Sequence, residues 1–497
     1  MLLNGCPEMY YVLAIDQGTS GTKALIFDEQ GSVCARGFEL LQCTHLRPGF
    51  VEQDPNALYG SVLRAVQQCL QHFSGDAARI AGVAISSQRE TVVLWHQDGT
   101  PVVPAISWQC QRSLGICKRL RENGMAPRIA ARTGLLLDPY FSASKLIWLH
   151  ENDAKARQAI DAGRAYFGTV DSWLLFRMTH GAAYLTDYTN ASRTMLFNLE
   201  TLEWDRELLA DFGLQSLRLP ELRPSSADFG VTDFDGILDR PVPIVSMIGD
   251  SHAAALGEGC LSPGVAKATM GTGSSIMMNV GNKPQAADHG LVSTLCFATK
   301  HRVDYALEGI VISAGSTPSF LKEKLRLVKD FAEAEQAFTD YDNGGVFLIP
   351  AFSGIGCPHW KYPGGAQIVG LNFSTSWQNV ARAAYESIVY QIKDVIAVME
   401  QAANVPLREL FLDGGLVQRP FLLQYLADTL NRPVSTLALS EISAAGAAAL
   451  AALTLGSISS LDAYRETRVV ARRVEPGSGI EAAARNHEQW LQWIERL

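Results

Sequence analysis

A short polar turn near the N-terminus has the residue types that can hold a phosphate group and a metal ion. It spans Asp16–Lys23 and reads Asp-Gln-Gly-Thr-Ser-Gly-Thr-Lys, directly after an apolar run. Its glycines allow backbone N–H groups to approach phosphate oxygens, Lys23 adds a positive charge, and the Asp16 carboxylate can bind magnesium. The same composition is also typical of a solvated hairpin turn. It is not a P-loop, because neither Gly-Lys-Ser nor Gly-Lys-Thr occurs in the chain.

A second turn of this kind lies at Gly271–Ser275 and reads Gly-Thr-Gly-Ser-Ser between two apolar runs. Alone it indicates little, and Ile276 stands where a dinucleotide fingerprint has its last glycine. Together with the first turn it is more informative. Two phosphate-holding turns from opposing domains can clamp one triphosphate chain between them.

The segment Gly249-Asp250-Ser251 follows an apolar strand and allows two chemistries. Asp250 can act as a general base toward a hydroxyl group. Alternatively, Ser251 can act as a nucleophile, since Gly-Asp-Ser resembles the first block of one group of esterases. The hydrolase elbow Gly-x-Ser-x-Gly is missing, because Ala253 occupies its last position.

Arg89 and Glu90 follow another predicted strand and place a donor fork beside a carboxylate that only accepts hydrogen bonds. That combination can hold two vicinal hydroxyls, although a surface ion pair has the same composition. Trp108 and Tyr140 are aromatic residues in polar, turn-like surroundings, where they either pack in the core or line a site.

Strands and helices alternate along the chain and would position these residues. Apolar runs predict strands at 10–15, 24–27, 80–85, 242–248, 264–270, 276–280 and 410–412, and periodicity predicts a helix at 56–73. The run 444–455 predicts a buried helix. The order strand, Gly/Thr turn, strand occurs twice, which predicts two similarly built domains with a boundary near 250–262 and an α/β or α+β fold.

Composition excludes several other classes of protein. The 497 residues carry a net charge of −9 and no run of Lys or Arg, so we expect no nucleic-acid partner. The nine cysteines are scattered without a Cys-x-x-Cys pair, which argues against a disulfide framework. This pattern favours a reducing compartment, so we expect a cytoplasmic location. No apolar run approaches the about 18–20 residues of a membrane helix, so we expect no membrane span.

Assembled in order, these segments resemble the FGGY family of carbohydrate kinases over nearly the whole chain, and within that family most closely its glycerol-phosphorylating members. The resemblance rests on motifs that are polar, aromatic and specific in sequence. They are Ser87–Thr91, Ile106–Arg112, Thr133–Ser142, Thr186–Met195, Tyr305–Gly309 and Asp413–Gly415.

This resemblance implies an α/β fold of two actin-like (ribonuclease H-like) domains around a central cleft for nucleotide and substrate. Residues 1–255 would form the N-terminal domain, with the polyol site and the first phosphate turn. Residues 256–497 would form the C-terminal, nucleotide-binding domain. ATP and Mg²⁺ would be the cofactors, a small polyol or sugar the partner, and a homodimer or homotetramer a possible assembly.

The resemblance also implies roles for individual residues. Asp250 would be the catalytic base, and Asp16 would lie near the magnesium ion. The residues at the substrate would be Arg89, Glu90, Trp108, Tyr140, Asp250, Ser251 and Ser275. The residues at the nucleotide would be Thr19, Ser20, Lys23, Gly271, Thr272, Gly315, Gly415 and Arg419.

Several positions depart from the pattern of the glycerol-phosphorylating members. Ser251 stands where they usually have Gln, and Ser275 where they usually have Phe, so the pocket should be larger and wetter. The first turn ends in Lys23 rather than Arg. On the nucleotide side, Ser319 replaces a usual Gln and Arg419 a usual Asn.

The sequence therefore predicts an ATP-dependent kinase for a terminal hydroxyl of a small polyol, with glycerol as the leading substrate. The alternative within the family is a kinase for a four- or five-carbon polyol or ketose, such as erythritol, erythrulose or xylulose. A more remote alternative is an actin-like ATPase without a small substrate.

Overall fold

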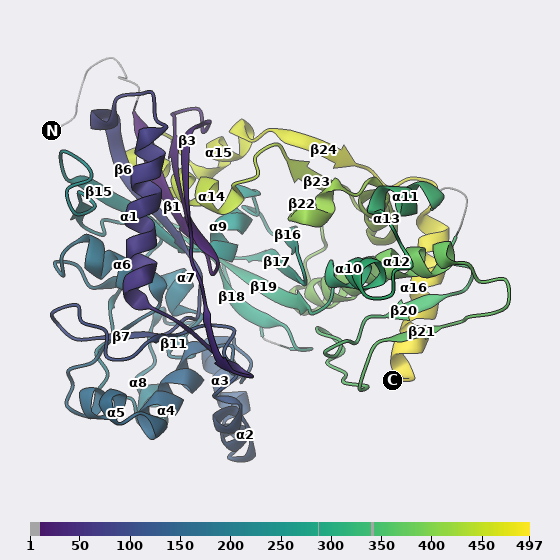
Figure 1. Ribbon diagram of the computed structural model, residues 1–497, viewed down its shortest axis with the longest axis horizontal. Helices are drawn as coiled ribbons and strands as arrows, with labels where there is room; N and C mark the ends of the chain where they lie inside the picture. Colours follow the sequence, from purple (N-terminus) through teal and green to yellow (C-terminus); the bar gives the residue numbers. More distant parts are fainter. Residues whose placement is uncertain (1–9, 287, 339–341) are drawn as a thin grey trace.

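Two mixed β-sheets form the frame of the computed structural model, which describes residues 10–286, 288–338 and 342–497 (Figure 1). The first sheet has the strand order β14-β15-β6-β1-β2-β3. Its strands are β1 (Tyr11–Gln17), β2 (Gly21–Phe27), β3 (Val33–Leu40), β6 (Ile80–Ser87), β14 (Val231–Thr232) and β15 (Val242–Gly249). Strands β1, β2 and β3 are antiparallel, whereas β6 and β15 run parallel to β1.

The second sheet repeats this arrangement and has the order β18-β19-β17-β16-β22-β23-β24. Its strands are β16 (Val265–Met270), β17 (Ser274–Gly281), β18 (Val292–Ala298), β19 (Val303–Val311), β22 (Glu409–Asp413), β23 (Val434–Leu437) and β24 (Val470–Val474). Again an antiparallel hairpin, β16–β17, is joined by parallel strands, β22 and β23. The turn within Asp16–Lys23 therefore connects β1 to β2, and the turn at Gly271–Ser275 connects β16 to β17. The two phosphate-type turns thus occupy equivalent places in the two sheets, as the repeated pattern in the sequence predicts.

Side chains alternate along β1, so the first sheet has two apolar faces. Leu13 and Ile15 pack toward the helices α1 (Pro55–Gln71) and α6 (Val170–Met178), which cover one face. Val12 and Ala14 pack on the other face, toward α9 (Asp250–Gly257) and α14 (Ile442–Leu455).

Helices α9 and α14 lie together between the two sheets, which Figure 1 shows near the centre of the molecule. They touch closely, because a Cβ atom at Gly446 would lie 1.9 Å from the carbonyl oxygen of Ala253. Helix α14 follows the whole second sheet except β24 in sequence, yet it packs on β1, β6 and β15 of the first. The position of α9 is therefore determined by residues from both halves of the chain.

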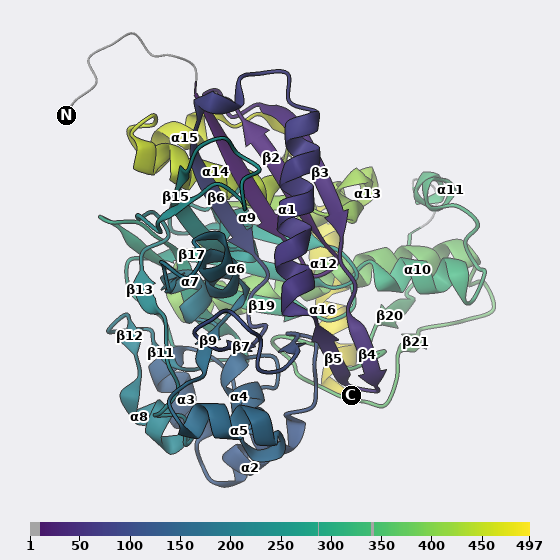
Figure 2. The same ribbon diagram turned by 60° about the vertical axis from the view of Figure 1, so that its left-hand side comes forward.

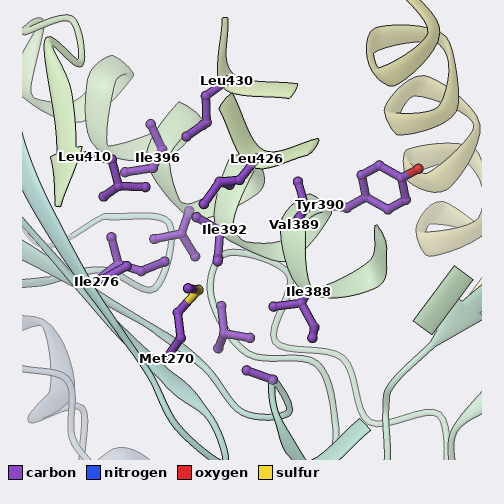
Figure 3. Close-up of a cluster of buried hydrophobic side chains, with 14 of the residues drawn as sticks. Met270, Ile276, Ile388, Val389, Tyr390, Ile392, Ile396, Leu410, Leu426 and Leu430 are labelled. Atoms are coloured by element: carbon purple, nitrogen blue, oxygen red, sulfur yellow. The ribbon is translucent and has the colours of Figure 1, made fainter. Parts of the chain in front are cut away.

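The face of the second sheet that is turned away from α9 and α14 carries the largest cluster of buried apolar side chains among the described residues (Figure 3). Ile388, Ile392 and Ile396 of α12 (Trp377–Ala403) face Met270, Ile276 and Leu410 of the sheet. Helices α13 (Pro420–Leu430) and α16 (Ile480–Glu495) complete this layer. Met270 is the last residue of β16, so this core anchors the strand from which the second turn emerges.

Smaller elements surround the two sheets, and many of the helices near α4 and α5 gather below the first sheet in Figure 2. The short strands are β4 (Thr44–Arg47), β5 (Phe50–Gln53), β7 (Val93–Trp95), β8 (Ala105–Ile106), β9 (Tyr166–Gly168), β10 (Leu185–Asp187), β11 (Phe197–Asn198), β12 (Glu203–Trp204), β13 (Glu221–Arg223), β20 (Phe347–Ile349) and β21 (Gln367–Val369). The remaining α-helices are α2 (Leu114–Glu122), α3 (Ala126–Thr133), α4 (Ser142–Asn152), α5 (Ala154–Asp161), α7 (Tyr188–Ala191), α8 (Arg206–Asp211), α10 (Ser316–Glu323), α11 (Phe331–Ala337) and α15 (Leu461–Thr467). In the part of the chain that the structure describes, no helix combines the length and apolarity that crossing a membrane requires.

Most of the predicted elements are confirmed, with shifted ends. The helix expected at 56–73 is α1, which begins at Pro55 after the N-cap Asp54, whose side chain accepts from the Asn56 amide. Helix α9 begins at Asp250, because Gly249 ends β15 and serves as the N-cap.

Candidate active site

Asp250 lies at the junction of β15 and α9, where its carboxylate is both held and accessible. Oδ1 accepts a hydrogen bond of 2.6 Å from the Ser251 amide and lies 3.2 Å from Nε of Arg89. The carboxylate therefore lies at the N-terminal end of α9 and beside a guanidinium group, which hold it in place. The side chain is 37% exposed, so a ligand can reach it.

Arg89 extends from the loop after β6 and links Asp250 to the second sheet. Its Nη2 donates to Oγ of Ser251 at 3.1 Å and lies 3.2 Å from Oε1 of Glu308 on β19. Ser275 on β17 donates to the same Glu308 oxygen at 3.1 Å. The two serines that were predicted at the substrate therefore lie on opposite sides of one ion pair.

Arg193 completes a buried network of alternating charges. Its Nε lies 2.6 Å from Oε1 of Glu90, and its Nη1 lies 2.7 Å from Oε2 of Glu308. Glu90 has a φ of 62°, an uncommon conformation for a residue with a side chain. The network brings Glu90 and Arg89, which are adjacent in sequence, onto different partners.

Burial and charge act in opposite directions on the carboxylates of this network. Burial alone would raise the pKa of Glu308, but the guanidinium groups of Arg193 and Arg89 hold that pKa far below its ordinary value. For Glu90, burial is the larger effect, and its pKa is raised although Arg89 and Arg193 oppose the change. Glu308 is therefore a permanent acceptor of hydrogen bonds at neutral pH.

Glu308 and Arg193 were not predicted as site residues, although both lie inside motifs that carry the resemblance. One signal was available in the sequence: Glu308 is a charged residue in the middle of the mainly apolar strand Val303–Val311, whose other charged residue, Asp304, lies near its start. A charge inside a buried strand requires partners, so it indicates either a buried ion pair or a site.

Trp108 and Tyr140 form one wall beside this network. Their ring centroids are 5.5 Å apart in an edge-to-face arrangement. Nε1 of Trp108 donates to Oγ1 of Thr19 at 2.8 Å, which connects this wall to the first phosphate-type turn. The buried Nζ of Lys145 donates to the carbonyl oxygen of Tyr140, which fixes the position of the Tyr140 backbone.

The first turn and its neighbours place charge beside Asp250. Oγ of Ser86 donates to Oδ1 of Asp16 at 3.0 Å, and burial together with the charge of Asp250 raises the pKa of Asp16 to about 6. Ser20 is exposed at the turn. Lys23, which was predicted at a phosphate, forms an ion pair of 2.6 Å with Glu441, the N-cap of α14.

The second turn borders a pocket of about 540 Å³ in the second half of the chain. Five of the eight residues predicted at the nucleotide line it, together with Ser319: Gly271, Thr272, Gly315, Gly415 and Arg419. Thr19, Ser20 and Lys23 do not border it. A Cβ at Gly315 would lie 2.6 Å from the carbonyl oxygen of Gly271, so the two segments approach as closely as glycine allows.

Aromatic side chains give this pocket an apolar wall suited to a flat ring. Phe320, Phe331 and Tyr385 line it, and the guanidinium carbon of Arg419 lies 5.1 Å from the ring centroid of Phe331. A nucleobase could stack there while the phosphates extend toward Gly271.

The esterase alternative finds no support in this geometry. Among the described residues, no histidine is hydrogen-bonded to Oγ of Ser251, which accepts from Arg89 instead. The adjacent His252 is buried, its Nε2 lies 3.3 Å from Oγ1 of Thr294, and burial holds its pKa well below the ordinary value. A nucleophilic serine needs a base that accepts the proton of its hydroxyl, and among the described residues no side chain accepts a hydrogen bond from Oγ of Ser251.

Comparison with known proteins identifies the class. Residues 11–257 match the N-terminal domain, and residues 266–455 the C-terminal domain, of the FGGY family of carbohydrate kinases. The chain belongs to this family and is a carbohydrate kinase, a phosphotransferase with an alcohol group as acceptor. The two-domain α/β fold of the family is confirmed, while the predicted boundary between residues 255 and 256 stays a prediction.

Several relatives cover nearly the whole chain. Glycerol kinase 1 of Thermotoga maritima is 41% identical over 98% of this chain and 99% of its own length. Glycerol kinase of Xanthomonas axonopodis is 39% identical over 98% of both chains. The crystal structure of Plasmodium falciparum glycerol kinase with ADP has a TM-score of 0.93 and 30% identity, with 98% of each chain covered. A gluconate kinase from Lactobacillus acidophilus, 20% identical with a TM-score of 0.87 over 98% of each chain, shares the fold.

Proposed function

We propose that this chain transfers the terminal phosphoryl group of ATP to a terminal hydroxyl of a small polyol, and that glycerol is a substrate, giving glycerol 3-phosphate. The accessible carboxylate of Asp250, held beside Arg89 at the start of a helix between the two sheets, is the observation that carries this proposal. The glycerol kinases among its relatives, one of them solved with ADP, support the choice of substrates.

The residues around Asp250 suit such a reaction. Asp250 would accept the proton of the attacking hydroxyl, while Arg89 and Glu90 would bind the neighbouring hydroxyls and Trp108 with Tyr140 would cover the carbon chain. Phosphoryl transfer requires mostly positioning and charge neutralisation from the protein. The pocket beyond Gly271 would hold the nucleobase of ATP, and the two hairpin turns would hold its phosphates.

A magnesium ion fits beside Asp16. Burial and the charge of Asp250 disfavour the ionised form of Asp16 and raise its pKa to about 6, so a cation bound beside it would stabilise the carboxylate. The described residues contain no group of three or more His, Cys, Asp or Glu side chains that could hold a metal ion. The remaining ligands would therefore be water and phosphate oxygens, which Mg²⁺ ordinarily retains. Bound there, magnesium would supply charge neutralisation to the phosphates.

The proposal is tested by measuring ADP release with purified protein, ATP and Mg²⁺, with and without glycerol. We expect turnover that depends on glycerol, and glycerol 3-phosphate as the product by mass spectrometry. ATP hydrolysis that does not respond to any polyol would reject the proposal in favour of an ATPase. A cytoplasmic location and a homodimeric or homotetrameric assembly stay predictions.

Replacing Asp16 by Asn is expected to have opposite effects on stability and on metal binding. Removing a carboxylate whose charged form is disfavoured in the folded state should stabilise the free protein by about 1–2 kcal/mol at pH 7. The same change should weaken binding of Mg²⁺ with ADP by about 10- to 100-fold. Thermal unfolding and calorimetric titration measure the two effects, with the exposed Asp239→Asn as the matched control. Unchanged Mg²⁺ affinity would contradict the assignment.

A further inference from the structure

Lys145 is a lysine whose ammonium group is buried without an ion pair. It lies in the first turn of α4 and is 0% exposed. Its Nζ donates to the carbonyl oxygens of Tyr140 and Phe141, and among the described residues it has no carboxylate as a direct partner. Burying a charge costs free energy, and a positive charge is also unfavourable in the first turn of a helix. Folding alone would therefore favour an apolar side chain at this position.

The carbonyl groups that Lys145 binds belong to the aromatic wall of the site. Tyr140 packs edge-to-face on Trp108, with ring centroids 5.5 Å apart, and among the described residues its hydroxyl makes no hydrogen bond. The position of the ring therefore depends on packing and on the backbone of Tyr140. Two residues later, Oγ of Ser142 donates to the carbonyl oxygen of Glu90 at 3.0 Å. Lys145 thus holds the short segment that joins the wall to a residue proposed to bind the polyol.

The charged and titratable groups that face the ammonium group come from the segments packed around it. They are Glu90 after β6, Cys110 after β8, Cys117 on α2 and Asp138 before α4. Burial lowers the pKa of Lys145 to about 8, although these groups oppose the change. Burial raises the pKa of the Cys117 thiol to about 11. Lys145 is therefore charged at neutral pH and loses its proton as the pH rises through about 8.

We propose that Lys145 is a positioning residue for the substrate: its ammonium group fixes the backbone at Tyr140 and so holds the aromatic wall where the carbon chain of the polyol binds. Because it is buried, Lys145 would not touch the polyol itself. The inference rests on the proposed polyol kinase activity and adds the residue that keeps one side of that site in place. A wall holds the polyol equally in the ground state and in the transition state, so its loss should raise KM and leave kcat nearly unchanged.

Lys145→Met keeps the length of the side chain and removes its donors and its charge. We expect KM for glycerol to rise by about 5- to 20-fold, kcat to change by less than about 3-fold, and ADP affinity to stay as in the unchanged chain. Steady-state kinetics and calorimetric titration measure these quantities. The matched control is Lys155→Met on α5, which removes an exposed lysine and should leave KM unchanged.

The pH dependence of KM distinguishes positioning by the ammonium group from a role in packing alone. In the unchanged chain, KM for glycerol should rise by about 3- to 10-fold between about pH 7 and about pH 9.5, because a neutral amine is a weaker donor than an ammonium group. In Lys145→Arg the donor stays charged, so KM should not change with pH over this range. In Lys145→Met, KM should be high at every pH. The other titratable groups are present in all three proteins, so a difference among them reports the group at position 145.

The outcomes separate this role from the proposed function. A KM that rises with pH only in the unchanged chain, together with a high KM in Lys145→Met, supports the inference. A folded Lys145→Met protein with the KM of the unchanged chain, or with a lower kcat at that KM, overturns it and leaves the polyol kinase standing. If Lys145→Met does not fold, the same pH profile of KM in the unchanged chain and in Lys145→Arg overturns it. Neither turnover nor binding of any polyol by the unchanged chain overturns the proposed function and this inference with it.

Discussion

Replacing Asp250 by Asn is expected to lower kcat by about 10²- to 10⁴-fold and to leave nucleotide binding almost unchanged. Asn keeps the size of the side chain and a hydrogen-bond acceptor for the Ser251 amide, so α9 can still begin at the same residue. It cannot take a proton from a hydroxyl. Steady-state kinetics with saturating glycerol measure the first effect, and calorimetric titration with ADP measures the second.

The exposed Asp239→Asn is the matched control for this change, because it also removes one carboxylate from the protein. Its kcat should equal that of the unchanged chain. Undiminished turnover in the Asp250 variant would reject this residue as the base. Loss of ADP affinity together with turnover would point instead to a disturbed junction between β15 and α9.

The second large effect is expected at Glu308, whose removal leaves two buried cations without their shared partner. Glu308→Ala should lower the free energy of unfolding by about 3–5 kcal/mol, because Arg89 and Arg193 would remain charged and buried. Glu308→Gln keeps the shape and one acceptor, so its cost should be smaller. Thermal and urea unfolding measure both variants.

Substitution of Glu308 should also weaken the binding of the substrate. Arg89 would lose the partner that fixes its Nη2 and should hold a polyol less well, so we expect a higher KM for glycerol in Glu308→Gln with a smaller change in kcat. The control is Glu203→Ala, on an exposed position of β12. A Glu308→Ala protein as stable as the control would contradict the charge network.

Sequence reasoning located the parts of the site that follow directly from local patterns. Asp250 and Arg89 follow β15 and β6, which are parallel neighbours in the first sheet, so their ends lie at one edge of that sheet. The turn at Gly271 likewise follows an apolar strand, β16 of the second sheet. The repeated strand-turn-strand pattern likewise predicted two equivalent sheets. Each of these patterns spans only a few neighbouring residues, so it can be recognised in a single sequence.

Contacts between segments that are distant in the sequence could not be predicted from such local patterns. Lys23 pairs with Glu441, 418 positions later, and Arg89 pairs with Glu308, 219 positions later. No spacing in one sequence reports such pairs. The charge of Lys23 was therefore assigned to a phosphate, whereas in the structure a carboxylate already holds it.

The path of helix α14 has a consequence for any attempt to divide the molecule. A cut between residues 255 and 256 would give a first fragment that lacks the alanine-rich surface of Ala444–Leu450, on which Val12, Ala14 and Leu25 pack. Such a fragment would expose an apolar face to water and would be prone to aggregate. Chimeras that exchange halves between relatives would have to match small residues such as Gly446 and Ala253 across that seam, because there is no room for a methyl group between them.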